Sequence, residues 1–201
     1  MVTPSFEHMS QNSSTTDGSE TRMEWFPMRV TYSRELKLKT SLDHLGIENF
    51  IPMHYEYVGE GQKRRLELVP AIHNLIFVRC SQERLTELKM TNKDLLPLRY
   101  MMRPVEGTTD KREIIRVPDK QMENFMRVAT VKDDKVMFLE YGSYLDKPGS
   151  RVKVTKGFFA GVEGTVKRIS NNRRVVVKID GVAAVAITNV PVEYLMEAND
   201  G

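Results

Sequence analysis

Hydrophobic and polar residues alternate along the C-terminal part of the chain. Val152 and Val154 stand between charged neighbours, which is the period of a strand with one buried face. Asn171-Asn172 and Asp180-Gly181 separate the extended runs that follow, and both pairs suit two-residue hairpin turns. The pattern predicts a small SH3-like β-barrel of about four or five strands.

The preceding part of the chain mixes helical and extended patterns. Leu38, Leu42 and Leu45 recur at helical spacing, with Ser33 as the expected N-cap and Gly46 as the stop signal. The predicted helices cover residues 33–45, 81–90 and the stretch from 118, and the predicted strands lie near 24–31, 48–58, 64–78 and 95–101. The order β-α-β-β-α-β with a closing helix predicts a ferredoxin-like α/β sandwich. The fold class of the whole chain is therefore expected to be α+β.

Composition divides the chain into four segments. Residues 1–22 are polar and lack the apolar content needed to fold, so they are predicted to be a disordered leader. We expect an amino-terminal domain over 23–130, a linker over 131–147 and the β-barrel over 148–201. The apolar run Val136–Leu139 inside that linker fits an extended segment packed on one of the domains.

Charge and cysteine content narrow the classes of function. Residues 147–201 carry nine Lys or Arg against five Asp or Glu, a net +4, while the whole chain carries +3. Such an excess on a small β-module favours an RNA or acidic protein partner, although solvated surface lysines explain it equally well. The single Cys80 excludes an intrachain disulfide and a thiolate zinc cage, and we expect it to be buried. Without a bilayer-spanning apolar run or a signal-peptide pattern, the chain is expected to act in the cytoplasm, with no membrane partner.

No arrangement of residues suggests catalysis. His44, His54 and His73 are dispersed without metal-ligand spacing, and the chain has no P-loop or nucleophile elbow. We therefore expect no enzyme activity, no cofactor and no metal site. The function should lie in binding surfaces.

Motifs in both parts of the chain resemble one protein family. The glycine pattern of the predicted barrel is similar to the KOW motif, carried here by Val152, Val154, Gly157, Phe159, Gly161, Gly164 and Val166. Glu24-Trp25-Phe26, the run Val69–Val78 and the helix start Val117–Met122 resemble the amino-terminal domain of the NusG family. The ending Val190–Leu195 resembles the UpxY-like antiterminators, a specialised branch, and the resemblance covers roughly residues 23 to 197.

This resemblance implies a transcription elongation or antitermination factor whose amino-terminal domain binds the clamp helices of the RNA polymerase largest subunit. The matching positions are Pro27, Met28, Ile72, His73, Leu75 and Phe77. Alternation along the strand places Leu75 and Phe77 on one face and Ile76 on the other. If helices cover the second face, we expect Leu75 and Phe77 to be exposed for docking.

Nucleic acid is the second expected partner. Lys63, Arg64 and Arg65 stand in a predicted hairpin loop that would contact DNA phosphates, although a solvated loop explains them equally well. The candidates in the KOW domain for RNA binding are Lys156, Phe158, Lys167, Arg168, Arg173 and Arg174. Phe158 is included because it and Phe159 are adjacent and cannot both face inward on regular extended chain. The KOW domain is also expected to contact the ribosome or another transcription factor.

A second class of function fits the same motifs. The KOW barrel would suit a ribosome-associated RNA-binding protein, but such a protein is expected to carry far more than the net +3 of this chain. An enzyme on the ferredoxin-like plan is a weaker alternative, because no residues can be named to perform its chemistry.

Overall fold

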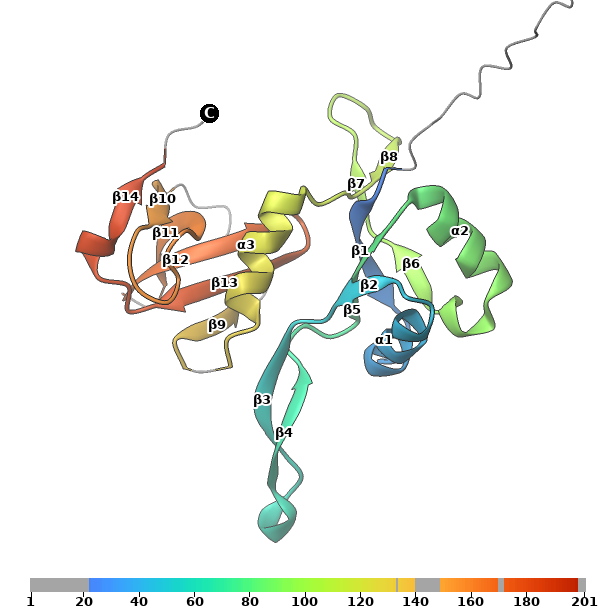
Figure 1. Ribbon diagram of the computed structural model, residues 1–201, viewed down its shortest axis with the longest axis horizontal. Coiled ribbons are helices and arrows are strands. Elements are labelled where there is room, and N and C mark those ends of the chain that lie inside the picture. Colours follow the sequence, from blue (N-terminus) through green and yellow to red (C-terminus); the bar gives the residue numbers. More distant parts are fainter. Residues whose placement is uncertain (1–21, 133, 140–148, 170–171, 199–201) are drawn as a thin grey trace, which may run out of the picture.

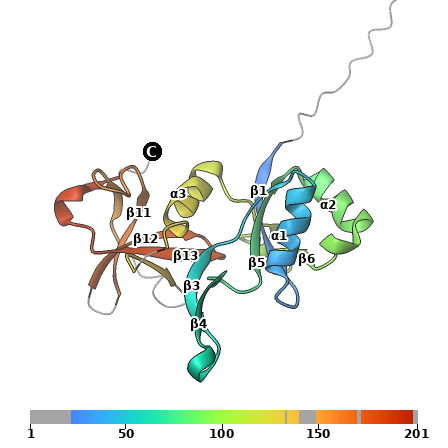
Figure 2. The same ribbon diagram turned by 60° about the horizontal axis from the view of Figure 1, so that its bottom comes forward.

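A computed structural model describes residues 22–132, 134–139, 149–169 and 172–198. Figure 1 shows two sheet-containing parts, with helix α3 (Asp119–Ala129) between them and a two-stranded ribbon extending away from both. The turned view in Figure 2 shows the same arrangement. Among the described helices, none is long and apolar enough to cross a membrane.

The first part is built on a four-stranded antiparallel sheet, here called the N-terminal sheet. Its strands and their connecting helices are β1 (Glu24–Val30), α1 (Glu35–His44), β2 (Glu48–Phe50), β5 (Leu75–Cys80), α2 (Gln82–Thr91) and β6 (Leu98–Tyr100). The strands lie in the order β2-β5-β1-β6. The predicted β-α-β-β-α-β order is thus confirmed, and the arrangement fits a ferredoxin-like fold.

The starts of α1 and α2 differ in how they are capped. Ser81 caps α2, because its hydroxyl accepts a hydrogen bond from the Arg84 backbone N–H at 3.3 Å. The expected cap Ser33 of α1 is wrong, since Arg34 holds the N-cap position without a side-chain cap. Ser33 instead has a positive φ of 48°, and its N–H donates to Asn74 Oδ1 at 3.2 Å.

Helices α1 and α2 cover one face of the N-terminal sheet. The buried residues of this core are Phe26, Met28, Val30, Leu38, Leu42, Ile47, Ile51, Ile76, Val78, Cys80, Leu85, Leu95 and Leu98. Cys80 is buried as predicted, and burial raises the pKa of its thiol. A buried neutral thiol contributes to packing and is a poor nucleophile.

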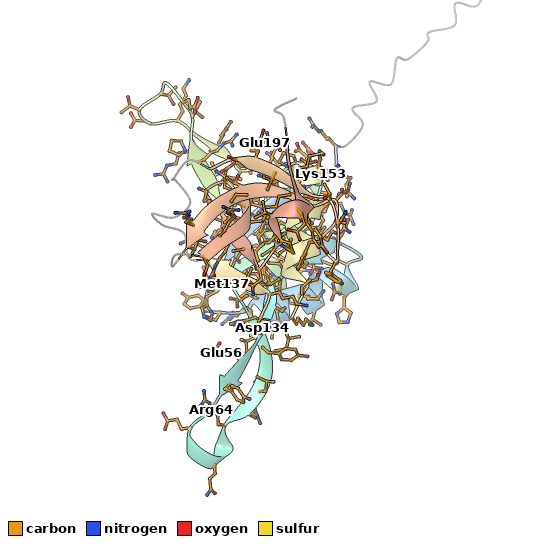
Figure 3. All side chains as sticks on the ribbon, turned by 90° about the vertical axis from the view of Figure 1, so that its left-hand side faces the viewer. Glu56, Arg64, Asp134, Met137, Lys153 and Glu197 are labelled. Atoms are coloured by element: carbon orange, nitrogen blue, oxygen red, sulfur yellow. The ribbon has the colours of Figure 1, made fainter. Side chains whose placement is uncertain are left out.

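Two β-hairpins occur in addition to the N-terminal sheet and its helices. The ribbon consists of β3 (Met53–Val58) and β4 (Arg65–Pro70), joined through the short 3₁₀ helix Gly61–Lys63. A smaller hairpin consists of β7 (Met102–Pro104) and β8 (Arg112–Ile114). Figure 3 shows the ribbon standing clear of the remaining structure, with Arg64 on its outer half.

The second part is a six-stranded antiparallel sheet, here called the C-terminal sheet. Its strands are β9 (Val136–Leu139), β10 (Arg151–Val154), β11 (Glu163–Ile169), β12 (Asn172–Ile179), β13 (Ala183–Thr188) and β14 (Leu195–Glu197), in the order β14-β10-β11-β12-β13-β9. This is consistent with the predicted small β domain. Because β9 pairs with β13, residues 136–139 of the expected linker belong to this sheet. Residues 133 and 140–147 of the expected linker lie outside the described residues. Residues 1–21 of the expected leader also lie outside them.

Glycines shape the connections of the C-terminal sheet. Gly157 and Gly161, with φ of 78° and 92°, lie in the loop between β10 and β11, where the sequence predicts turns. The connection between β12 and β13 has three residues rather than the expected two, because Ile179 pairs with Ala183. Gly181 takes the positive φ in it. The other expected hairpin turn includes Asn171, which lies outside the described residues.

Candidate protein-binding and nucleic-acid-binding surfaces

The predicted docking strand β5 divides its residues between two cores. Leu75 and Phe77 belong to one apolar cluster, and Ile76 and Val78 belong to the core under α1 and α2. The predicted face assignment is therefore confirmed. The expected exposure is wrong, because Leu75 is 3% exposed and Phe77 is completely buried.

Helix α3 explains this burial. The Phe77 ring lies 5.6 Å from the ring of Phe125 in α3, and Phe50 lies 6.4 Å from Phe77 and 6.5 Å from Phe125. A helix with large apolar side chains must bury them against a partner, and α3 uses the sheet face that α1 and α2 leave open. Sequence reasoning identified α3 but did not place it on this face.

The other predicted docking residues do not form one surface. Pro27 is buried opposite Phe77 on the neighbouring strand, Ile72 is half-buried against the same cluster, and His73 is exposed. Met28 must be removed from the set, because it is completely buried in the core under α1 and α2. Along β1, as along β5, neighbouring residues point to opposite faces of the sheet.

The apolar cluster that contains Phe77 continues into the C-terminal sheet. It joins Trp25, Leu75 and Phe77 of the N-terminal sheet to α3 and to buried residues of β10, β12 and β13. The α3 members are Met122, Phe125, Val128 and Ala129. Since both sheets pack on α3, removing the C-terminal sheet would expose apolar surface around this helix.

Polar contacts also connect α3 with the C-terminal sheet. Lys120 Nζ lies 3.0 Å from Glu163 Oε1. This hydrogen bond is the main reason that the pKa of Glu163 is lowered. Gln121 Nε2 donates to the Lys178 carbonyl at 3.1 Å, and the Glu163 N–H donates to Asn124 Oδ1 at 3.4 Å. A cavity of about 780 Å³ lies beside these contacts.

The three cations predicted to contact DNA lie at the tip of the ribbon. Lys63 ends the 3₁₀ helix, and Arg64 and Arg65 follow it, all exposed. The Arg64 guanidinium stacks over the Tyr57 ring at 4.8 Å, while Arg65 forms an ion pair with Glu67. The structure therefore brings these residues together in an accessible position, as the sequence predicts.

The ribbon also carries exposed aromatic residues that sequence reasoning did not select. Tyr55 is 52% exposed and Tyr57 is 59% exposed. Both lie on β3 two residues apart, so they share a face of the ribbon. Their alternation with polar His54 and Glu56 was a signal in the sequence, but it did not reveal that both tyrosine rings would remain more than half exposed.

The predicted RNA-binding residues of the C-terminal sheet lie at two separate places. Lys156 and Phe158 are exposed in the loop before β11. Phe158 is 75% exposed and Phe159 is buried, which confirms that one of the pair faces outward. Arg168 and Arg173 are exposed partners at the other end of β11, so the two groups do not form one patch.

Two further predicted residues lie on the opposite face of β11 and β12. Lys167 pairs with Arg174 across these strands. Lys167 is only 7% exposed and shares its face with buried Ile169. The prediction that Lys167 contacts phosphates at the surface is therefore wrong. Arg174 is half-buried and donates to Met137 Sδ at 2.7 Å.

Comparison with known protein families matches the N-terminal part of the chain to one of them. The model of the NusG family, described as transcription termination factor nusG, matches residues 23–126. The chain belongs to the NusG family. The matched segment holds the N-terminal sheet, both hairpins and most of α3, and it ends before the C-terminal sheet. A search of curated proteins gave no match.

The NusG family is one of transcription factors rather than enzymes. Within the described ranges, no group of three or more His, Cys, Asp or Glu side chains is placed to hold a metal ion.

Proposed function

We propose that this chain is a transcription elongation or antitermination factor of the UpxY-like branch, acting in the cytoplasm. Its N-terminal domain binds the clamp helices of the RNA polymerase largest subunit, and residues 148–201 form a KOW domain that binds RNA or a protein factor. The match of the NusG family to residues 23–126 is the observation that carries this proposal. Bridging the clamp would shift the polymerase population toward its closed, elongating state without a chemical step.

The buried position of Leu75 and Phe77 determines how docking would occur. Ile72 is half-buried against the same apolar cluster, and His73 is exposed. Leu75 and Phe77 lie under α3, and the C-terminal sheet packs on the same cluster. Docking through the apolar surface around α3 therefore requires the C-terminal sheet to move away. The free energy of the contacts that hold it would reduce the apparent affinity for the clamp.

Loosening these contacts should therefore strengthen clamp binding. The triple variant Lys120→Ala, Gln121→Ala and Asn124→Ala removes the polar contacts between α3 and the C-terminal sheet. We expect it to bind the isolated clamp coiled coil more tightly than the unmodified chain, with an unchanged fold by circular dichroism. Calorimetric titration of the coiled coil measures the difference.

Glu123→Ala is the matched control, because Glu123 is exposed on the same helix. Equal affinity of the triple variant and the unmodified chain would mean that docking does not use the α3 surface. If no variant binds the coiled coil and the chain co-purifies with ribosomal subunits, the ribosome-associated function replaces the proposed one.

The ribbon tip supplies the proposed contact to DNA. Replacing Lys63, Arg64 and Arg65 by Ala should weaken binding to duplex DNA of any sequence, because phosphate contacts carry no base information. Each lost phosphate contact should reduce the slope of log affinity against log salt by about one unit. Fluorescence anisotropy over a series of salt concentrations measures this slope. If the variant without Lys63, Arg64 and Arg65 shows the same slope as the unmodified chain, the three cations belong to a solvated loop.

A further inference from the structure

The ribbon β3–β4 has two chemically different faces. Residues directly opposite each other in an antiparallel pair share a face, and Tyr55 pairs with Leu68 while Tyr57 pairs with Leu66. Met53 and Pro70 complete this face at the base of the ribbon. This face, here called the tyrosine face, carries no acidic side chain.

The acidic side chains of the two strands lie on the other face. Glu56 pairs directly with Glu67, and two carboxylates in such a position repel each other. His54 Nε2 lies 3.5 Å from Glu56, and Arg65 forms an ion pair with Glu67. The opposite face is therefore polar and internally paired, while the tyrosine face has neither acids nor ion pairs.

The outer half of the tyrosine face is open to solvent. Tyr55, Tyr57 and Leu66 are 52%, 59% and 53% exposed. An isolated two-stranded hairpin is at best marginally stable in water, so leaving three large apolar groups uncovered at its end gives the ribbon no evident stability. Such exposed groups on a projecting element indicate a binding surface.

Positive charge borders this face at both ends. The Arg64 guanidinium lies over the Tyr57 ring at 4.8 Å, and Lys132 Nζ lies over the Tyr55 ring at 6.0 Å. Lys132 comes from the segment after α3, so two separate parts of the chain place a cation on a tyrosine ring. A partner for this surface must therefore be anionic and must offer flat apolar groups.

Unpaired bases in a nucleic-acid strand have this combination. Aromatic side chains on a β-element stack with bases of any sequence, and nearby cations contact the connecting phosphates. In a duplex, each base is already stacked on its neighbours and its ring faces are covered. We propose that the tyrosine face of the ribbon binds the unpaired bases of a single-stranded nucleic acid, through stacking on Tyr55 and Tyr57.

This inference rests on the nucleic-acid contact proposed for the same hairpin. It adds a second function, because the basic tip binds phosphates in duplex or single strands, while the tyrosines require exposed bases. The two contributions can be separated by removing either the tyrosine rings or the bases.

The test uses the full chain and labelled probes of equal length: oligo(dT), oligo(U), an abasic deoxyribose-phosphate strand and a DNA duplex. Fluorescence anisotropy should show that the chain binds oligo(dT) or oligo(U) at least about tenfold more tightly than the abasic strand. Whichever of oligo(dT) and oligo(U) binds more tightly identifies the bound nucleic acid as DNA or RNA. Equal binding of the abasic strand would overturn the proposal.

The variants distinguish stacking from simple apolar contact. Tyr55→Leu with Tyr57→Leu keeps the apolar area but removes the aromatic rings, and should reduce binding of the base-containing strand to the abasic level. Tyr55→Phe with Tyr57→Phe should keep the affinity within about twofold, because phenylalanine still stacks. Val58→Ala on the opposite face is the matched control, since Val58 is 38% exposed and pairs with Arg65.

Unchanged oligonucleotide binding by the leucine variant would overturn the proposal and indicate a protein partner for this face. Binding of the DNA duplex distinguishes failure of the stacking inference from failure of the proposed nucleic-acid contact. If the duplex still binds with the expected salt slope while the tyrosines have no effect, only the stacking inference fails. If neither duplex nor single strand binds, the proposed nucleic-acid contact of the hairpin fails as well.

Discussion

Replacing Phe77 by alanine should lower the free energy of unfolding by about 3–5 kcal/mol, the range for truncating a buried aromatic residue. Phe77 is completely buried, and its ring contacts the rings of Phe50 and Phe125. The substitution would leave a cavity between the N-terminal sheet and α3. Urea denaturation followed by circular dichroism measures the change.

Phe158→Ala is the control for this experiment. Phe158 is 75% exposed, so its removal should change the free energy of unfolding by no more than about 0.5 kcal/mol. A Phe77→Ala protein as stable as the unmodified chain would mean that α3 does not cover this strand. In that case Phe77 would be available for direct docking, as the sequence alone suggests.

Replacing Gly164 by valine should destabilise the C-terminal sheet by about 1–3 kcal/mol, because overpacked groups cannot be accommodated without moving backbone. A Cβ atom on Gly164 would lie 2.6 Å from the Val176 carbonyl oxygen and 2.9 Å from Val175 Cγ1. Relieving these contacts would force β11 away from β12, which pair over residues 165–169. Thermal melting and backbone amide exchange in β12 measure the loss.

Gly181→Asn is the matched control at another glycine of the same sheet. Nothing lies within 4 Å of a Cβ built on Gly181, and its φ is +72°, a conformation that asparagine tolerates better than other side chains. We expect this variant to melt near the unmodified chain. If Gly164→Val melts there too, the close contact between β11 and β12 is absent in solution.

The interaction surfaces depend on the same packing. Because the cluster around Phe77 includes both sheets and α3, destabilising either sheet should also change access to the proposed polymerase-docking surface. The ribbon is different, since the outer half of the tyrosine face is exposed and contributes little to the core. Substitutions there should change binding without changing stability.

Local patterns in the sequence determined the helices, the strands of the N-terminal sheet and the two faces of β5. Period-two alternation separated Leu75 and Phe77 from Ile76 and Val78, and the structure places the two pairs in different cores. Ser81, the first residue of the predicted helix over 81–90, caps α2. These features depend on residues near one another in the chain, so backbone geometry alone fixes them.

Tertiary structure alone decided what covers each face. Period-two alternation shows that Phe77 and Lys167 each point to a particular side of a sheet, but not that α3 buries the first or that the second is only 7% exposed. It likewise could not show that the run Val136–Leu139 joins the C-terminal sheet or that Tyr55 remains 52% exposed. Burial depends on which distant segments pack together, and that choice minimises the apolar surface of the whole chain rather than of any one element.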